Sequence, residues 1–314
     1  MSSNTSSNMS SKTGNNTGND MPRPANPGTA APDAFSDSIH SSLWQEEAED
    51  GDPFSAARCR LAGYDVYGDL LARAGYSDYL YLLFRGERAS PAQARAFAVL
   101  AIALANPGPR DPSVHAAMAT GVSGTPAAAS LIAALAPGAG SHGGAREVLL
   151  AMQAWQEAGC DLARRTQALR EPAAPTRSGV WPQAEHAPGF AAYGVRCATP
   201  VRQTLDLLAS LMVNTLTSPL PADGQLAFLQ RERGALEAAA GLPLAMTGVA
   251  AAALLDLGFD PASGEMLTLM LRLPGAAAHA LEQQRQGFRQ FPFFALELQN
   301  DPRDPRHADL KEAA

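Results

Sequence analysis

The spacing of apolar residues predicts helices over most of the chain. From about residue 43 onward, apolar side chains recur every three or four positions, as on one face of a helix, and no stretch keeps the alternation expected of a half-buried strand. Apolar positions around Leu80 follow this spacing, and further helices are expected over 93–104, 126–135, 145–158, 204–216, 225–240, 249–257 and 274–287. The predicted fold class is therefore all-α.

Local start and stop signals support these helices. Two pairs place a capping side chain before a proline at the first helical position: Ser90-Pro91 and Asp260-Pro261. Three glycines lie where the left-handed residue that ends a helix is expected: Gly159, Gly241 and Gly258. The caps thus divide the apolar pattern into separate helices.

Two segments depart from the helical pattern. Residues 1–42 consist mainly of Ser, Asn, Gly, Pro and Ala, and they cannot bury enough apolar surface to offset chain entropy, so we predict a disordered tail. Residues 171–200 contain five prolines and three glycines. A long irregular connection inside a helical domain is typical of a functional loop or a linker, and we favour a loop beside a site.

Charge and composition exclude several classes of function. The net charge of −7 is concentrated in the first 50 residues, so the nearly neutral remainder predicts no nucleic-acid partner. Lysine occurs only at Lys12 and Lys311, which argues against Schiff-base and P-loop enzymes. The three cysteines form no CxxC pair, and no metal site is expected. Without a signal peptide or a long apolar run, we expect no membrane association and a cytoplasmic location.

A glycine-rich segment supplies the first candidate chemistry. His142 is followed by Gly143 and Gly144, directly before a predicted helix. A histidine beside the free N–H groups of a helix start could donate a hydrogen bond to an oxyanion. Taken alone, the segment also fits a glycine-rich turn with an incidental histidine.

Further motifs place this segment in a wider pattern. They are, in order, 63–66 (GYDV), 78–87 (DYLYLLFRGE), 90–93 (SPAQ), 141–147 (SHGGARE), 187–190 (APGF), 254–259 (LLDLGF) and 272–283 (RLPGAAAHALEQ). In this order and at these spacings, the chain resembles the citrate synthase superfamily, particularly its shorter citryl-CoA lyase members. The resemblance extends from about residue 63 to residue 299.

The resemblance implies a two-domain helical protein that works as a homodimer. On this basis, residues 43–150 and 258–314 would form a large domain, and residues 151–257 a small domain that closes over the cleft. A keto acid or dicarboxylate and an acyl-CoA such as acetyl-CoA would bind between them. The implied activity is acyl transfer with C–C bond formation, or cleavage of citryl-CoA, with acyl-CoA as substrate and no resident cofactor.

Three residues match functional positions of that superfamily. His142 would stabilise the enolate of the acyl-CoA, and Arg272 would pair with a substrate carboxylate through its planar guanidinium. His115 would contact the keto acid, although the Glu and Asn of the superfamily's corresponding run are absent here. The implied site is therefore only partly retained.

Three other matched positions have lost their functional side chains. Ala192 replaces the histidine that polarises the ketone, and Val201 replaces a substrate-binding arginine. Thr247 stands where the catalytic carboxylate is expected, and a hydroxyl is too weak a base to take a carbon-bound proton unaided. Ordinary citrate synthesis is therefore not expected.

Two kinds of function stay open on the sequence. The protein could be an enzyme with altered or weak activity, or a non-catalytic relative that binds a metabolite or regulates a complete citrate synthase paralogue. A carboxylate close to Thr247 would favour an enzyme, because a general base must reach the reacting proton directly or through one water.

Overall fold

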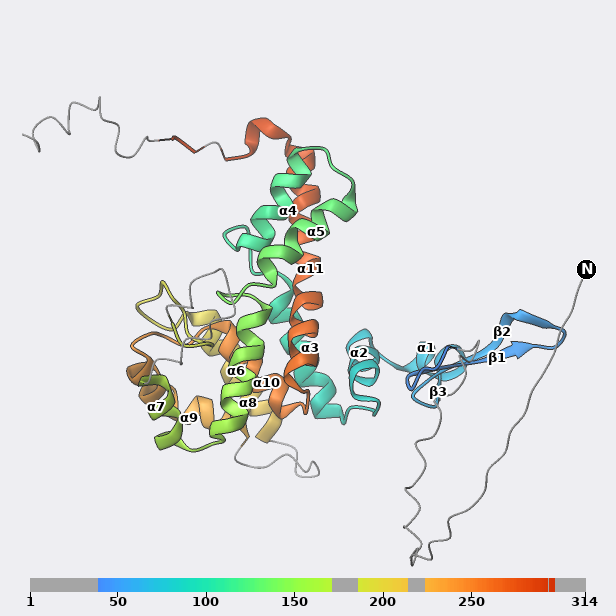
Figure 1. Cartoon of the computed structure of the whole chain (residues 1–314), viewed down its shortest axis with the longest axis horizontal. Helices are drawn as coiled ribbons and strands as arrows, with labels where there is room; N and C mark the ends of the chain where they lie inside the picture. The colour runs from blue at the N-terminus through green and yellow to red at the C-terminus, as the bar shows by residue number, and fades with distance from the viewer. Residues whose placement is uncertain (1–38, 171–185, 214–223, 293, 297–314) are drawn as a thin grey trace, which may run out of the picture. The chain divides into compact units, whose positions relative to one another are not determined.

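The computed structural model describes residues 39–170, 186–213, 224–292 and 294–296. The chain divides into two units, Met1–Ser41 and Ser42–Ala314, and every described element lies in the second unit. The longer helices are α2 Tyr76–Arg85, α3 Pro91–Ala105, α4 Pro112–Val122, α5 Ala127–Gly138, α6 Ala145–Ala158, α7 Leu162–Arg170, α8 Thr199–Val213, α9 Gln225–Ala240, α10 Met246–Asp256 and α11 Pro261–Gln286 (Figure 1). Short helical turns occur at η1 Val66–Leu70, α1 Leu71–Arg73 and η2 Phe288–Gln290. This architecture confirms the all-α fold class.

Some predicted segments lie outside the described residues. They are residues 1–38 of the predicted tail, residues 171–185 of the predicted loop, and residues 214–216 of one predicted helix. The described remainder of the loop, residues 186–198, has no helix and makes one isolated bridge, between Phe190 and Leu244.

The predicted helix caps are confirmed. The Ser90 hydroxyl accepts the N–H of Gln93, whose side chain in turn accepts the N–H of Ser90. Asp260 accepts the N–H groups of Ala262 and Ser263 at the start of α11. At the three predicted stops, glycine has positive φ: +61° at Gly159, +67° at Gly241 and +84° at Gly258.

Two predicted helix starts are wrong: α8 begins at Thr199 rather than at residue 204, and α11 differs by a larger margin. The helix expected to begin at residue 274 instead begins at Pro261, and Pro274 lies inside α11. A proline normally interrupts a helix because it lacks an N–H and crowds the preceding turn. Here α11 packs along α4, α5 and α6, and Gly275 lies so close to α3 that a Cβ would be 2.5 Å from the Ala105 carbonyl oxygen. Tertiary packing therefore overrides the local preference.

A small sheet is present that the apolar spacing does not predict. Strands β1 Trp44–Glu49, β2 Asp52–Leu61 and β3 Tyr64–Asp65 form an antiparallel sheet in the order β1-β2-β3. Most of β1 and β2 is exposed on both faces, so the sequence carries no apolar alternation. The available signal was Asp50-Gly51, a dipeptide typical of tight hairpin turns; Gly51 has φ +78°.

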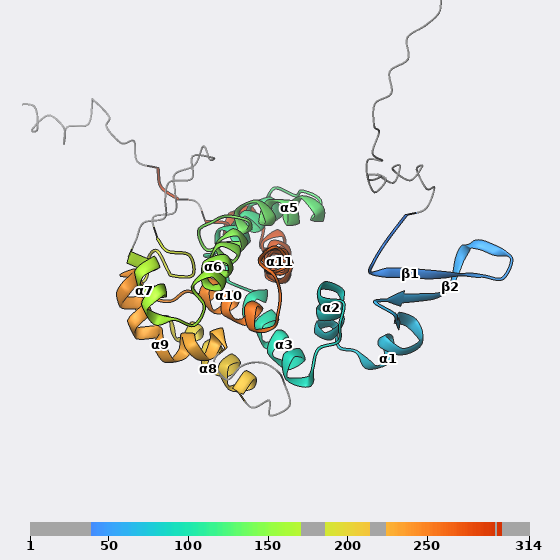
Figure 2. The same ribbon diagram turned by 60° about the horizontal axis from the view of Figure 1, so that its bottom comes forward.

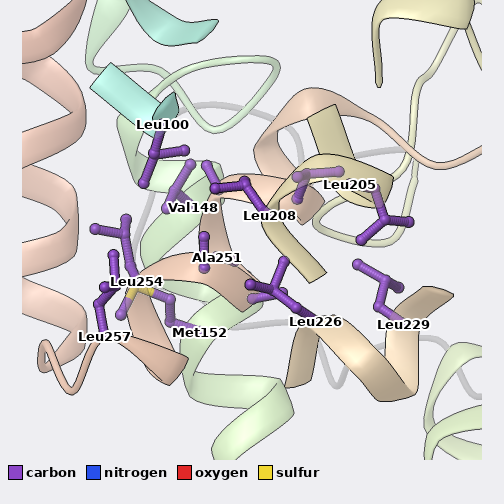
Figure 3. Close-up of a cluster of buried hydrophobic side chains, with 14 of the residues drawn as sticks. Leu100, Val148, Met152, Leu205, Leu208, Leu226, Leu229, Ala251, Leu254 and Leu257 are labelled. Carbon is purple, nitrogen blue, oxygen red and sulfur yellow. The ribbon is translucent and has the colours of Figure 1, made fainter. Parts of the chain in front are cut away.

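Helix α10 lies at the centre of the main core. Its residues from Val249 to Leu254 are completely buried, as expected for a helix that is apolar on all sides. Figure 3 shows side chains from several helices around it, including Leu100, Val148, Met152, Leu205, Leu208, Leu226 and Leu229. Both ribbon views place α6 beside α10 and α11 (Figures 1 and 2). The start of α6 and the start of α10 are thereby held in fixed positions.

A smaller core joins α4, α5 and α11 through Val114, Ala117, Ala134, Ala276 and Ala280. The main core draws on α3 as well as on α8, α9 and α10, so it includes residues assigned to both predicted domains. The predicted boundaries at residues 151 and 257 stay a prediction. Within the described residues, no helix is long and apolar enough to cross a membrane.

Candidate functional site

A buried carboxylate, Glu147, connects three separate segments of the chain. It lies in the first turn of α6 and is 1% exposed. Its Oε1 accepts the Thr247 hydroxyl at 2.6 Å and the Gly189 N–H at 3.0 Å, and its Oε2 accepts the Gly143 N–H at 2.5 Å. Glu147 therefore gathers the His142-Gly143 segment, the loop before α8 and the start of α10.

The local sequence explains how Glu147 reaches these donors. Gly144 precedes α6 as its N-cap residue, and an acidic residue in the first turn is favoured by the positive end of the helix dipole. Gly143 has φ +71°, a conformation that glycine adopts without strain. This geometry lets the Gly143 N–H donate back to the carboxylate four residues later.

Two glycines let the loop before α8 approach α10. Gly189 has φ +90°, and its carbonyl oxygen accepts the N–H of Ala245 at 2.9 Å. A Cβ on Gly248 would lie 2.5 Å from the same Gly189 oxygen, closer than any side-chain carbon can approach. Small residues on both sides thus bring Gly189 and Thr247 to the same carboxylate.

Two histidines lie side by side next to Glu147. His142 is exposed, and its ring centroid lies 5.4 Å from that of His186, with the rings tilted by 44°. The His186 side chain is 4% exposed, and its Nε2 lies 3.5 Å from Glu147 Oε2. Its Nδ1 is buried and has no hydrogen-bond partner among the described residues. The histidine pair and the carboxylate form one polar cluster between α6 and α10.

Arg272 is connected to the same cluster through Gly143. On α11, its Nη1 donates to the Gly143 carbonyl oxygen at 2.7 Å, and its Nη2 lies 2.5 Å from Asp111 Oδ2. Asp111 is also the N-cap of α4, where it accepts the N–H of Ser113. Both Nη groups thus have protein partners, and buried Nε has none in the described part of the chain. The predicted contact of Arg272 with a substrate carboxylate stays a prediction.

The third predicted site residue has a different environment. His115 lies on α4, and its ring stacks on Phe291 with centroids 5.6 Å apart. His142 and Arg272 are brought together through Gly143, whereas the aromatic contact of His115 is with the segment after α11. A role for His115 in binding a keto acid also stays a prediction.

The three substituted positions lie in different environments. Thr247 is nearly buried and donates to Glu147. Ala192 is exposed, and Val201 is a buried core residue near the start of α8. The carboxylate expected to favour an enzyme is present beside Thr247, because Glu147 Oε1 lies 2.6 Å from the threonine hydroxyl.

Sequence reasoning did not single out Glu147 or His186. For Glu147 a signal existed, since it lies on the apolar face of the predicted helix with Ala151 four residues later, and a charge there implies a buried partner. His186 lies in a proline-rich loop, where no periodicity indicates which side chains point inward.

Comparisons with solved structures identify the fold. Citryl-CoA lyase from Hydrogenobacter thermophilus matches with a TM-score of 0.59 and 18% identity, over 87% of this chain and 99% of that chain. ATP citrate lyase from Methanothrix soehngenii, in complex with citrate and coenzyme A, matches with a TM-score of 0.62 and 17% identity, over 85% of this chain and 43% of that chain. A D541A mutant of Methanosaeta concilii ATP citrate lyase, in complex with (3S)-citryl-CoA, matches with a TM-score of 0.61 and 16% identity. This match covers 85% of this chain and 43% of that chain.

The sequence matches no family model and no curated protein. At 16–18% identity, the structural matches establish the helical fold of citryl-CoA lyase and of the corresponding part of ATP citrate lyase. This agrees with the fold implied by the sequence motifs. Function has to be argued from the site itself.

Proposed function

We propose that this protein binds an acyl-CoA together with a keto acid or dicarboxylate and catalyses slow or altered C–C bond chemistry of the citryl-CoA lyase type. The observation that carries the proposal is the convergence of three motif segments on Glu147. The similar structures that contain citrate, coenzyme A or (3S)-citryl-CoA support this class of ligand.

His142 is the proposed enolate-stabilising residue. It is exposed, it precedes the N-terminus of α6, and Glu147 and Arg272 both fix the neighbouring Gly143. An imidazole held there can donate to the thioester oxygen as negative charge develops, which is the most effective place for a fixed donor. The enolate of acetyl-CoA would thus form against a preorganised site.

The proposed rate is low because the acid–base groups differ from those the superfamily implies. Thr247 cannot take a proton from carbon, and Ala192 cannot polarise a carbonyl. Loss of one general acid or base costs on the order of 10² to 10⁴ in rate. We further propose a cytoplasmic homodimer that needs no resident metal or cofactor.

Cleavage of citryl-CoA by the purified protein tests this function. Acetyl-CoA and oxaloacetate are quantified by chromatography, and His142→Ala is expected to lower the rate at least about 100-fold through loss of a transition-state donor. His279→Gln is the control, because His279 is paired with Glu282 on α11, at 2.8 Å. Equal rates for His142→Ala and wild type would refute the role of His142.

A second candidate function is binding without turnover. This candidate is favoured by the hydrogen bonds to Glu147. They already engage both of its oxygens, so the carboxylate is not free to take a proton from a substrate. This candidate predicts calorimetric binding of coenzyme A or a dicarboxylate without any product from citryl-CoA. Co-purification with a complete citrate synthase paralogue would indicate a regulatory subunit.

A further inference from the structure

The buried ring of His186 has one nitrogen that stays unpaired within the described ranges of the chain. Its side chain is 4% exposed, and its Nδ1 has no partner in the part of the chain that the structure describes. A buried polar atom without a hydrogen bond costs free energy of folding, so native proteins rarely keep one without a reason. The exposed ring of His142 lies next to it, with the two ring centroids 5.4 Å apart.

The neighbouring carboxylate of Glu147 determines which nitrogen of the His186 ring carries the proton. Glu147 accepts hydrogen bonds from Thr247, Gly189 and Gly143, so both of its oxygens act as acceptors. Because His186 Nε2 faces the acceptor oxygen Glu147 Oε2 at 3.5 Å, the tautomer with its proton at Nε2 is expected. The lone pair is then on Nδ1, the nitrogen that finds no partner among the described residues.

We infer that His186, oriented by Glu147, is the proton acceptor of this site. The inference rests on the proposed function and supplies the base that Thr247 cannot provide. The Thr247 hydroxyl is engaged as a donor to Glu147, and Glu147 itself is held by three donors. Asp256, also in α10, caps α9 by accepting the N–H groups of Gln225 and Leu226.

His186, Glu147 and His142 can account for every proton and electron pair that moves when citryl-CoA is cleaved. His186 Nδ1 accepts the proton of the citryl-CoA hydroxyl, and the O–H electron pair forms the keto group of oxaloacetate. The C–C bond breaks, and its electron pair enters the thioester enolate beside His142. The His186 imidazolium, paired with Glu147, then returns the proton to the enolate carbon, so acetyl-CoA forms and the histidine is neutral again.

Deuterium exchange into acetyl-CoA tests the inference directly. In heavy water, the base removes a methyl proton and returns deuterium, which mass spectrometry detects without any keto acid. His186→Gln is expected to lower the exchange rate by about 10² or more, while calorimetry shows unchanged affinity for coenzyme A. His279→Gln, the same substitution at another histidine with a carboxylate partner, is expected to exchange at the wild-type rate.

Glu147→Gln separates orientation from proton transfer. Glu147 acts here as a positioning residue, so this substitution is expected to lower kcat for cleavage with little change in KM, because the neutral amide no longer favours the Nε2–H tautomer. His186→Gln carries the test if Glu147→Gln does not fold. Wild-type exchange and cleavage rates in His186→Gln overturn this inference while leaving the proposed function intact. A folded wild type that neither exchanges nor cleaves overturns both.

Discussion

At the scale of single residues, Glu147 determines the arrangement of the site. A carboxylate that is 1% exposed is stable only when its oxygens are hydrogen-bonded, and three donors from three segments meet that need. Each donor is consequently held in position by its hydrogen bond to a Glu147 oxygen. The cluster is therefore rigid as well as polar, as a preorganised site requires.

Substitution of Thr247 tests this dependence. Thr247→Val keeps the shape but removes the hydroxyl that donates to Glu147 at 2.6 Å. We expect the free energy of unfolding in urea to fall by about 1–3 kcal/mol, the usual cost of removing a partner from a buried polar group. Thr247→Ser keeps the donor and is expected to stay within about 1 kcal/mol of wild type. Equal stability of Thr247→Val and wild type would contradict the account of Glu147.

Asp256 gives a prediction about pH. Burial raises the pKa of its carboxyl group, although the N–H groups of Leu226 and Gln225 oppose the shift. The folded state then holds the proton of Asp256 more tightly than the unfolded state does. The protonated carboxyl therefore favours folding at low pH, and this contribution to the free energy of unfolding is lost as pH rises through the raised pKa. As pH rises above about 4, the ordinary pKa of Asp, the stability of wild type relative to Asp256→Asn is therefore expected to fall.

Asp260 provides the matched control for this titration. Hydrogen bonds from Ser263 lower the pKa of its carboxyl group, so its contribution is present at neutral pH and is lost as pH falls through the lowered pKa. The stability of wild type relative to Asp260→Asn should consequently stay nearly constant above about pH 4, the ordinary pKa of Asp, and fall only as pH drops below it. The same slope for both pairs in urea unfolding would show that burial does not govern Asp256.

At the scale of elements, close backbone contact between Gly189 and Gly248 positions the loop against α10. Glycine inside a helix is less favourable than alanine by roughly 0.5–1 kcal/mol, so its presence at Gly248 needs a packing reason. The reason is the Gly189 carbonyl oxygen, which would lie 2.5 Å from a Cβ at this position. The same contact holds Gly189 in place to donate to Glu147.

Two glycine-to-alanine substitutions separate packing from helix propensity. Gly248→Ala is expected to destabilise the protein by about 1–3 kcal/mol through overpacking, and to lower activity by displacing Gly189. Gly234→Ala, in the exposed interior of α9, has nothing within 4 Å of the new Cβ and is expected to gain up to about 1 kcal/mol. Thermal unfolding compares them, and a stabilised Gly248→Ala would contradict the contact.

Sequence predicted helices well where their signals are local. The caps at Ser90 and Asp260 and the stops at Gly159, Gly241 and Gly258 depend on neighbouring residues only. Pro274 wrongly predicts the start of a helix, because packing around α11 outweighs the cost of an internal proline. The strands were missed because a hairpin exposed on both faces has no apolar alternation.

At the scale of the whole molecule, the site depends on contacts between distant segments. The motifs identified His142 and Arg272, and the structure connects both to Gly143. Glu147 and His186 became candidates only when residues far apart in the sequence were placed together, since 100 positions separate Glu147 from Thr247. A helical fold shared with citryl-CoA lyase is therefore predictable from motif order, whereas the acid–base groups are not.

A single-turnover experiment with citryl-CoA and an excess of the purified protein shows whether the site cleaves this thioester. Excess protein makes slow chemistry visible, because every substrate molecule can be bound at once. We expect stoichiometric conversion to acetyl-CoA and oxaloacetate by wild type, and conversion at least about 100-fold slower by His142→Ala. Citryl-CoA that stays intact with folded, coenzyme A-binding wild type would contradict it.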